Sequence, residues 1–198
     1  SPAFGTPENA LANLAGGQLA RYYKLPHRTS ACNASNAVDA QAVYETQMAL
    51  WGSVMGHGNL IYHTAGWLEG GLVASFEKVI VDCEMLQHMT SMLKPMKIDL
   101  DEIGLEAMHQ VGPGGHFFGC DHTMARYKDA FYQPFLSDWQ NHENWEAAGS
   151  QDTTARATKI WQQVLEGATC EVAVANFAAA WATNGACFAN TVRREVVM

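Results

Sequence analysis

The chain has 198 residues, 48% of them hydrophobic, and a formal net charge of −8 at pH 7. Such a composition excludes a disordered chain and predicts one domain with a sizeable core, or a piece of a larger one. The acidic balance and the lack of any Lys/Arg run argue against a nucleic-acid interface or a face for anionic membranes. We therefore expect a small-molecule or protein partner.

Cysteine usage and hydropathy indicate the compartment. The chain has an odd number of cysteines without a Cys-x-x-Cys motif, at Cys32, Cys83, Cys120, Cys170 and Cys187. This pattern predicts reduced thiols in a cytoplasmic protein. No signal peptide is seen, and no apolar run reaches the roughly 18 to 20 residues of a membrane helix. Ser1 stands just before a helix start, so we expect an amino-terminal portion to precede it.

The first half alternates helical patterns with short apolar runs. Thr6, Pro7 and Glu8 begin a predicted helix that continues to about Leu25, and Asp39 begins a second that Gly56 and Gly58 end. Residues 27–33 and 59–63 read as strands after these helices. Helix, strand, helix, strand with short connections is typical of parallel α/β units.

The second half is predominantly helical. A long helix is predicted over 72–93, with inward side chains at Val73, Phe76, Ile80, Cys83, Met89 and Leu93. Met85, Met89, Met92 and Met96 read as adaptable core filler rather than a ligand box. Further helices are predicted at 99–110, after Asp121 and at 155–166, whereas 132–145 reads as an irregular covering segment.

These elements predict an α/β fold that holds the later part of a (β/α)8 TIM-type barrel with a carboxyl-terminal helical extension, as a fragment. Only two strands are visible, too few to cover so many apolar helices. We expect late βα units over 1–98 and a helical, aromatic-rich extension over 99–167. Residues 168–198 form an atypical tail, rich in alanine and valine and almost uncharged before Arg193.

Polar side chains follow both predicted strands. After the first come Asn33, Ser35, Asn36, Asp39 and Gln41. Their amides and carboxylate can orient a ligand, but capping of the next helix by Asn36 or Asp39 explains them equally well. After the second strand, at the carboxyl end where α/β enzymes place reacting groups, stand Tyr62, His63, Trp67 and Glu69.

This second group suits a methylated or protonated amine. Aromatic faces and a carboxylate attract such cations, by about 0.5 to 2 kcal/mol per ring. His63 can serve as acid, base or hydrogen-bond donor. The alternative is a core aromatic with a capping Glu69.

A third group is formed by His109, His116, Cys120 and His122. It lacks the paired ligand spacing of zinc sites, and Asp121 with Thr123 suffices to explain a helix start, so we predict no metal. The glycine-rich turn at 112–115 lacks a Walker lysine, and no Gly-x-Ser-x-Gly elbow occurs.

Several motifs, in the same order, resemble the carboxyl-terminal part of the trimethylamine methyltransferase family over roughly residues 1–167. They are Thr6-Pro-Glu-Asn-Ala, Gln18-Leu-Ala-Arg-Tyr-Tyr, Val38-Asp-Ala-Gln-Ala, Ala65-Gly-Trp-Leu-Glu-Gly-Gly-Leu, Gly115-His-Phe-Phe-Gly and His122-Thr. The resemblance implies a longer βα barrel that passes a methyl group from a tertiary or quaternary amine to the Co(I) corrinoid (cobalamin) of a separate small protein. It implies no corrinoid held tightly by this chain, and we expect a homo-oligomer at full length.

With that activity in view, we predict catalytic roles for His63 and Glu69. Substrate contacts are predicted for Tyr62, Trp67, Asn33 and Gln41, and corrinoid contacts for Asn59, Asp39 and His116. Archaeal members carry pyrrolysine, whereas only standard residues occur here, so the chain resembles relatives without it and trimethylamine and glycine betaine both remain candidate substrates. Two alternatives stay open, a non-catalytic amine-binding or regulatory relative and an inactive truncated fragment. The tail departs from the charged helical ending of the family.

Overall fold

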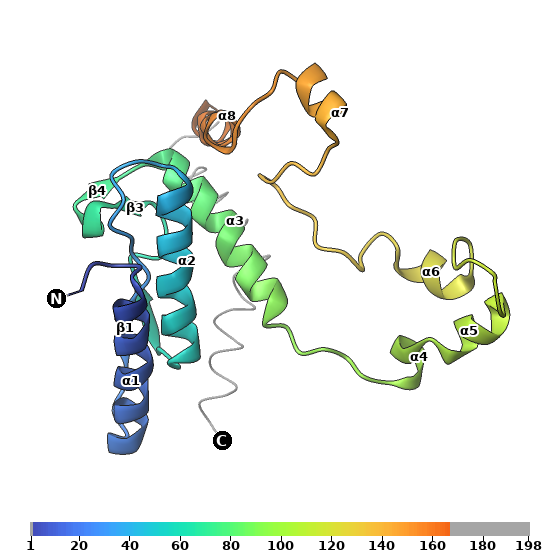
Figure 1. Ribbon diagram of the computed structural model, residues 1–198, viewed down its shortest axis with the longest axis horizontal. Coiled ribbons are helices and arrows are strands. Elements are labelled where there is room, and N and C mark those ends of the chain that lie inside the picture. Colours follow the sequence, from blue (N-terminus) through green and yellow to red (C-terminus); the bar gives the residue numbers. More distant parts are fainter. Residues whose placement is uncertain (1, 167–198) are drawn as a thin grey trace.

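Helices and short strands alternate over the first part of the chain. The computed structural model describes residues 2–166 (Figure 1). The order begins with α1 (Pro7–Tyr23), β1 (Arg28–Ser30), α2 (Ala40–Met55) and β2 (Leu60–Tyr62). A small hairpin of β3 (Trp67–Leu68), the 3-10 helix η1 (Glu69–Gly71) and β4 (Val73–Ala74) then leads into α3 (Phe76–Met92). The remaining helices are α4 (Leu100–Ile103), α5 (Leu105–Val111), α6 (Asp121–Arg126), α7 (His142–Ala147) and α8 (Thr153–Glu166).

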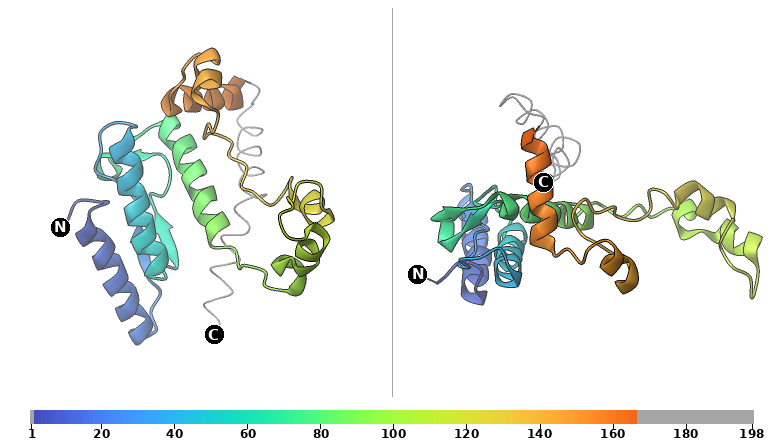
Figure 2. Two further views of the ribbon diagram at one scale, coloured as in Figure 1. Left: turned by 45° about the vertical axis from the view of Figure 1, so that its right-hand side comes forward. Right: turned by 90° about the horizontal axis from the view of Figure 1, so that it is seen from above.

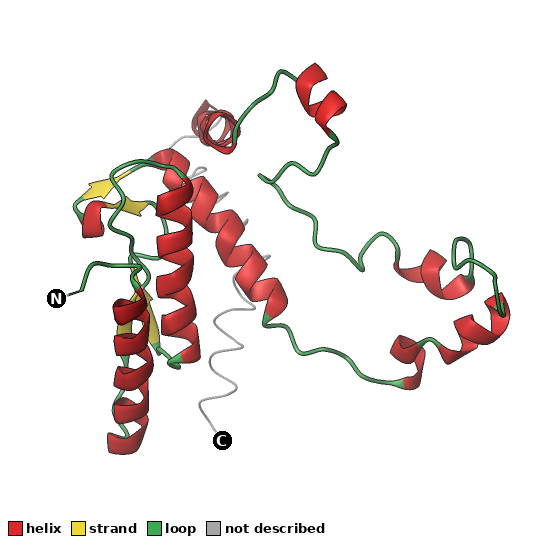
Figure 3. Ribbon diagram, viewed as in Figure 1, coloured by secondary structure: helices red, strands yellow, loops and turns green. Residues whose placement is uncertain are grey.

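The two predicted strands pair in parallel. Thr29 of β1 lies opposite Ile61 of β2, and the register runs from Arg28 beside Leu60 to Ser30 beside Tyr62. Figure 3 shows this pair beside α1 and α2. The α/β character and the parallel pairing are therefore confirmed. In residues 2–166 no third strand joins this sheet, so the barrel stays a prediction.

Side-chain caps fix where the helices begin. The Thr6 hydroxyl accepts from the amide of Asn9, the Asp39 carboxylate from Ala42 and the Ser75 hydroxyl from Lys78. Such caps satisfy amides that have no partner within the helix. The predicted starts of α1 and α2 are confirmed, and of the two candidate caps for α2 the structure selects Asp39.

The predicted start of the long helix at Leu72 is wrong. Trp67 pairs with Ala74 and Leu68 with Val73 in an antiparallel hairpin, and Ser75 then caps α3. Because the hairpin shares its residues with an apolar run of helical spacing, periodicity alone missed it. Val73 and Phe76, predicted to point inward, are 43% and 60% exposed.

Two apolar clusters hold the chain together. Ala31 after β1, Ala49 and Leu50 of α2 and Met85 and Met89 of α3 form the first. The second joins Ile80 and Val81 of α3 to Leu136 and to Ala157 of α8, and α8 lies against the start of α3 in both views of Figure 2. Met85 and Met89 are core residues as predicted, but Met92 and Met96 are 53% and 83% exposed, so the predicted methionine filler is half wrong.

Helices α1 and α2 approach closely through small residues, and this gives a first prediction. A Cβ added at Gly17 would lie 1.8 Å from the carbonyl oxygen of Gly56. Ala gains about 1 kcal/mol of helix propensity, but overpacking against backbone costs about 1 to 3 kcal/mol. We expect Gly17→Ala to lower the free energy of unfolding by up to about 2 kcal/mol in urea titrations. Gly16→Ala, which meets only the movable His27 ring at 3.0 Å, is the control, and equal stability of the two variants would contradict the packing argument.

Residues 94–131, called the arm here, extend away from α1, α2 and α3 and carry α4, α5 and α6 (Figures 1 and 2). The chain returns to α3 at the buried carboxylate of Glu84, which accepts hydrogen bonds from the amides of Phe135 and Leu136 and from two hydroxyls, those of Tyr132 and Ser137. These contacts, at 3.1 to 3.2 Å, fasten the returning segment.

Among residues 2–166 no helix is both long and apolar enough to cross a membrane.

Candidate functional site

The carboxyl ends of β1 and β2 meet at one edge of the sheet, as their parallel pairing requires. Ser30 is the last residue of β1, and its hydroxyl lies 3.2 Å from Nδ1 of His63, which directly follows β2. The ends of the two strands therefore lie side by side. Crevices at this edge are where parallel sheets place ligands.

Two aromatic rings lie next to each other at this edge of the sheet. The imidazole of His63 and the indole of Trp67 meet edge to face, with 5.3 Å between ring centroids and an interplanar angle of 88°. Trp67 is 36% exposed, so its ring remains available to a ligand. Tyr62 differs, because the guanidinium carbon of Arg28 lies 4.1 Å from its ring centroid and already provides a cation for that face.

The backbone around these rings is constrained. His63 and Glu69 have φ values of 54° and 50°, a left-handed conformation that costs a non-glycine residue about 1 to 2 kcal/mol. Such strain gathers at functional sites. Glu69 is exposed, and its carboxylate forms no ion pair or hydrogen bond with residues 2–166 in this structure, so it stands at the rim of the site rather than inside it.

The left-handed conformation of Glu69 gives a second prediction. Glycine adopts this conformation without a steric penalty, whereas alanine does not. Both Glu69→Gly and Glu69→Ala remove the carboxylate, yet we expect the glycine variant to be more stable by about 1 kcal/mol in thermal unfolding. An alanine variant as stable as the glycine variant would show that the turn relaxes.

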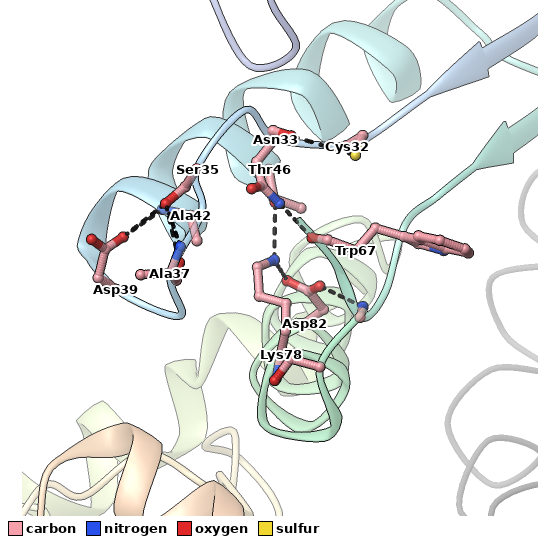
Figure 4. A network of polar contacts seen from close by, with 12 residues as sticks. Cys32, Asn33, Ser35, Ala37, Asp39, Ala42, Thr46, Trp67, Lys78 and Asp82 are labelled. Atoms are coloured by element: carbon pink, nitrogen blue, oxygen red, sulfur yellow. Dashed lines mark hydrogen bonds and ion pairs between the residues drawn. The ribbon is translucent and has the colours of Figure 1, made fainter. Parts of the chain in front are cut away.

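Behind the rings lies a buried polar network that sequence reasoning missed (Figure 4). Lys78 and Asp82, one helical turn apart on α3, are 0% and 1% exposed and form an ion pair. The Lys78 ammonium also donates to Thr46 Oγ1 at 3.1 Å, and the second Asp82 oxygen accepts from the amide of Gly66 at 2.9 Å. Burial raises the pKa of Asp82 to about 6 even though the Lys78 charge acts to lower it.

A signal for this network was present in the sequence. Lys78, Asp82, Met85 and Met89 follow the i, i+4, i+7, i+11 spacing of one helix face, and the two methionines belong to the core. A lysine and an aspartate on an apolar stripe are buried and must pair with each other. The helical prediction weighed only the apolar residues of the stripe.

Asn33 is part of this network. It is 1% exposed, and its amide donates to Thr46 Oγ1 at 3.0 Å and to the carbonyl oxygen of Trp67 at 2.7 Å. Its side-chain oxygen is buried without a partner among residues 2–166. The predicted substrate contact is therefore placed beneath the site, where it holds the Trp67 peptide.

The other residues of the first cluster support the start of α2. Asp39 caps the helix and lies 3.3 Å from the Ser35 hydroxyl. The Gln41 amide donates to Glu45 at 2.8 Å, and the second Glu45 oxygen accepts from the amides of Ala34 and Ser35. In this cluster the structure shows Asp39 as a helix cap, and the Gln41 side chain is hydrogen-bonded within the chain to Glu45.

The residues predicted to contact a corrinoid do not share a site. Asn59 precedes β2 and accepts from the amide of His27 at 2.7 Å, so it lies at the opposite end of the strands from His63. His116 is exposed in the loop between α5 and α6, on the arm. Asp39 stands at the start of α2, so the structure places these three residues in separate parts of the chain.

The third cluster of the sequence lies on the arm. His122 Nε2 is 2.8 Å from the carbonyl oxygen of Asp101, and Cys120 Sγ is 3.2 Å from the Thr123 hydroxyl. Cys120 occupies the N-cap position of α6, with Asp121 as the first helical residue rather than the cap. Over residues 2–166, no three His, Cys, Asp or Glu side chains converge as metal ligands would.

Comparison with known proteins identifies relatives of this chain. Residues 1–174 match the family described as trimethylamine methyltransferase (MTTB). The chain is 39% identical over 166 residues to a glycine betaine methyltransferase of Desulfitobacterium hafniense (strain Y51), which covers 83% of this chain and 34% of that protein. It is 31% identical over 168 residues to the trimethylamine methyltransferase MttB of another strain of that species (DSM 10664 / DCB-2), with 84% and 34% covered.

A more distant relative is the trimethylamine methyltransferase MttB2 of Methanosarcina mazei, 28% identical over 163 residues, 82% of this chain and 32% of that protein. The chain thus spans about a third of the length of these curated relatives. The family match extends over most of the chain, beyond the last residue that the structure describes, and confirms the family that the motifs of the sequence resemble. The chain belongs to the trimethylamine methyltransferase family.

Proposed function

We propose that the protein of which this chain is part transfers a methyl group from a quaternary amine of the glycine betaine class to the Co(I) corrinoid of a separate protein. The proposed reaction type rests on membership of the family. The proposed substrate class rests on the relative at 39% identity, which is named for glycine betaine. The site supports it through the observation that the partly exposed indole of Trp67 meets the imidazole of His63 at the carboxyl end of β2.

The chemistry explains why a cation site matters. As the methyl group leaves, the C–N bond breaks and its electron pair goes to nitrogen, while the acceptor supplies the pair for the new bond to carbon. Nitrogen departs as a neutral amine only if it begins with four bonds. Trp67 binds that positive charge through its ring face. The imidazole of His63, which stands at right angles to the indole, helps to position the amine.

Glu69 supports the same cation from the rim. Its exposed carboxylate lies in the turn next to Trp67, where a negative charge lowers the energy of an incoming ammonium group. Since the carboxylate is solvated, its contribution is smaller than that of the ring, and it falls with ionic strength.

The test measures the amine product. The protein, expressed as its gene encodes it, is incubated with a Co(I) corrinoid protein and either glycine betaine or trimethylamine. Mass spectrometry then follows the amine that is one methyl group lighter. We expect product from glycine betaine and little from trimethylamine, and turnover of trimethylamine alone would overturn the substrate class.

Calorimetry with the same amines separates the alternative readings. Binding of glycine betaine without any product would favour a binding or regulatory module. Neither binding nor product from a cooperatively folded protein would contradict the proposal altogether.

A further inference from the structure

The indole of Trp67 is presented by a turn that is held from several directions. The Gly66 amide donates to Asp82 at 2.9 Å, and the Trp67 carbonyl accepts from Asn33 at 2.7 Å. Two residues further on, the amides of Glu69 and Gly70 donate to the carbonyls of Ser35 and Asn33, both at 2.8 Å. The peptide of Trp67 is therefore fixed on both sides, while its ring remains exposed.

Two of these contacts, those to the Gly66 amide and to the Trp67 carbonyl, are linked through Thr46 of α2. Its hydroxyl oxygen is 3.0 Å from the Asn33 amide nitrogen and 3.1 Å from the Lys78 ammonium, and Thr46 is 0% exposed. Thr46 thereby connects the side that holds the Trp67 carbonyl with the side that holds the Gly66 amide (Figure 4). An oxygen that accepts from both an amide and an ammonium fixes the distance between α2, α3 and the loop after β1.

Burying the Lys78–Asp82 ion pair costs desolvation free energy that an apolar core of the same volume would not. A buried ion pair is often no more stabilising than apolar residues of the same volume, so its presence in a core needs another reason. Lys78 is fully buried and paired, hence it cannot touch a substrate. What the pair does reach is the Gly66 amide, one residue before the ring that borders the site.

We infer that Thr46, Lys78 and Asp82 are positioning residues that set the orientation of Trp67 toward the amine. The inference rests on the proposed function, in which Trp67 binds the substrate cation. It adds that the ring's placement is determined by buried polar contacts from α2 and α3 and not only by the local hairpin. A misplacement of about 1 Å in such a site costs up to about 100-fold in rate.

Thr46 offers a matched pair of variants. Thr46→Val keeps the shape but removes the oxygen that both donors share, whereas Thr46→Ser keeps the oxygen. We expect Thr46→Val to lower kcat/KM for the methylated amine at least tenfold and Thr46→Ser to stay within about threefold of the wild type. In a Trp67→Ala background, Thr46→Val should cause no further loss, because there is no ring left to position. Additive losses would overturn the inference.

Hydrogen exchange provides a readout that is independent of the reaction. The amides of Gly66, Glu69 and Gly70 should exchange at least tenfold faster in Thr46→Val, while the Met108 amide on the arm, bonded to Gly104, stays unchanged. Unchanged exchange at the turn sinks the inference even if the enzyme is active. Absence of wild-type turnover with faster exchange in the variant instead sinks the proposed function.

If Thr46→Val does not fold, Asp82→Asn serves in its place. It keeps an oxygen for the Gly66 amide and removes the charge that orients Lys78. The same hydrogen-exchange and double-variant measurements then apply. Faster exchange at the turn and no further loss in the Trp67→Ala background support the inference, and unchanged exchange or additive losses overturn it.

Discussion

Replacing Lys78 by methionine lowers the free energy of unfolding by about 3 to 5 kcal/mol. Methionine fills a similar volume, but it leaves the Asp82 carboxylate buried without its cation and Thr46 without one of its donors. Removing one partner of a buried pair is strongly destabilising for this reason. Urea unfolding followed by far-UV circular dichroism measures the loss.

Lys97 provides the matched control for this variant. Its ammonium lies 2.8 Å from Asp99, but its side chain is 68% exposed. Solvated ion pairs contribute little, so Lys97→Met should leave the urea midpoint close to that of the wild type. The double variant Lys78→Met with Asp82→Leu should recover part of the loss, since it leaves no unpaired charge but removes the acceptor of the Gly66 amide. Equal losses in Lys78→Met and Lys97→Met would show that the Lys78 pair is not buried in solution.

Replacing Trp67 by alanine should reduce kcat/KM for a quaternary amine by about 30-fold. A ring that holds a desolvated cation contributes about 2 kcal/mol, and that contribution disappears with the indole. Trp67→Phe keeps a smaller aromatic face and should lose less. Trp139→Ala is the control, because Trp139 is 64% exposed and borders a separate apolar cavity of about 420 Å³ beside Met85 and Met89.

A neutral isostere shows whether the loss concerns charge or shape. In 3,3-dimethylbutyrate a carbon replaces the nitrogen of glycine betaine, so the molecule has the same outline without the positive charge. Calorimetry should find that Trp67→Ala weakens binding of glycine betaine much more than binding of this analogue. Equal weakening of both ligands would mean that Trp67 contributes only apolar contact.

The parts of the site that could be predicted are those determined by local sequence. Strand ends in parallel α/β units lie at one edge whatever the rest of the chain does, so the approach of Ser30 and His63 followed from two strand assignments. The helix cap at Asp39 followed from residue type in the same way. These inferences needed no knowledge of which helix packs on which.

Tertiary packing decided the remainder. Asn59 looked like part of the same polar stretch as His63, but it stands before β2, and three residues of strand carry it to the other end of the sheet. Asn33 was expected to face a ligand, and instead its amide satisfies Thr46 and the Trp67 carbonyl. The place of Lys78 and Asp82 beneath Gly66 depends on α3 packing against α2, which periodicity does not reveal.

The carboxylate of Glu84 has a consequence for how chain length can vary in this protein. It ties the returning chain at Phe135 and Leu136 to α3, so the arm between them is a closed loop anchored at its base. The entropy of closing a loop grows only with the logarithm of its length, by about 0.6 kcal/mol per doubling. Insertions and deletions in the arm therefore cost little stability as long as its base stays anchored, and Glu84 shares that anchoring with the apolar cluster of Ile80, Val81, Leu136 and Ala157.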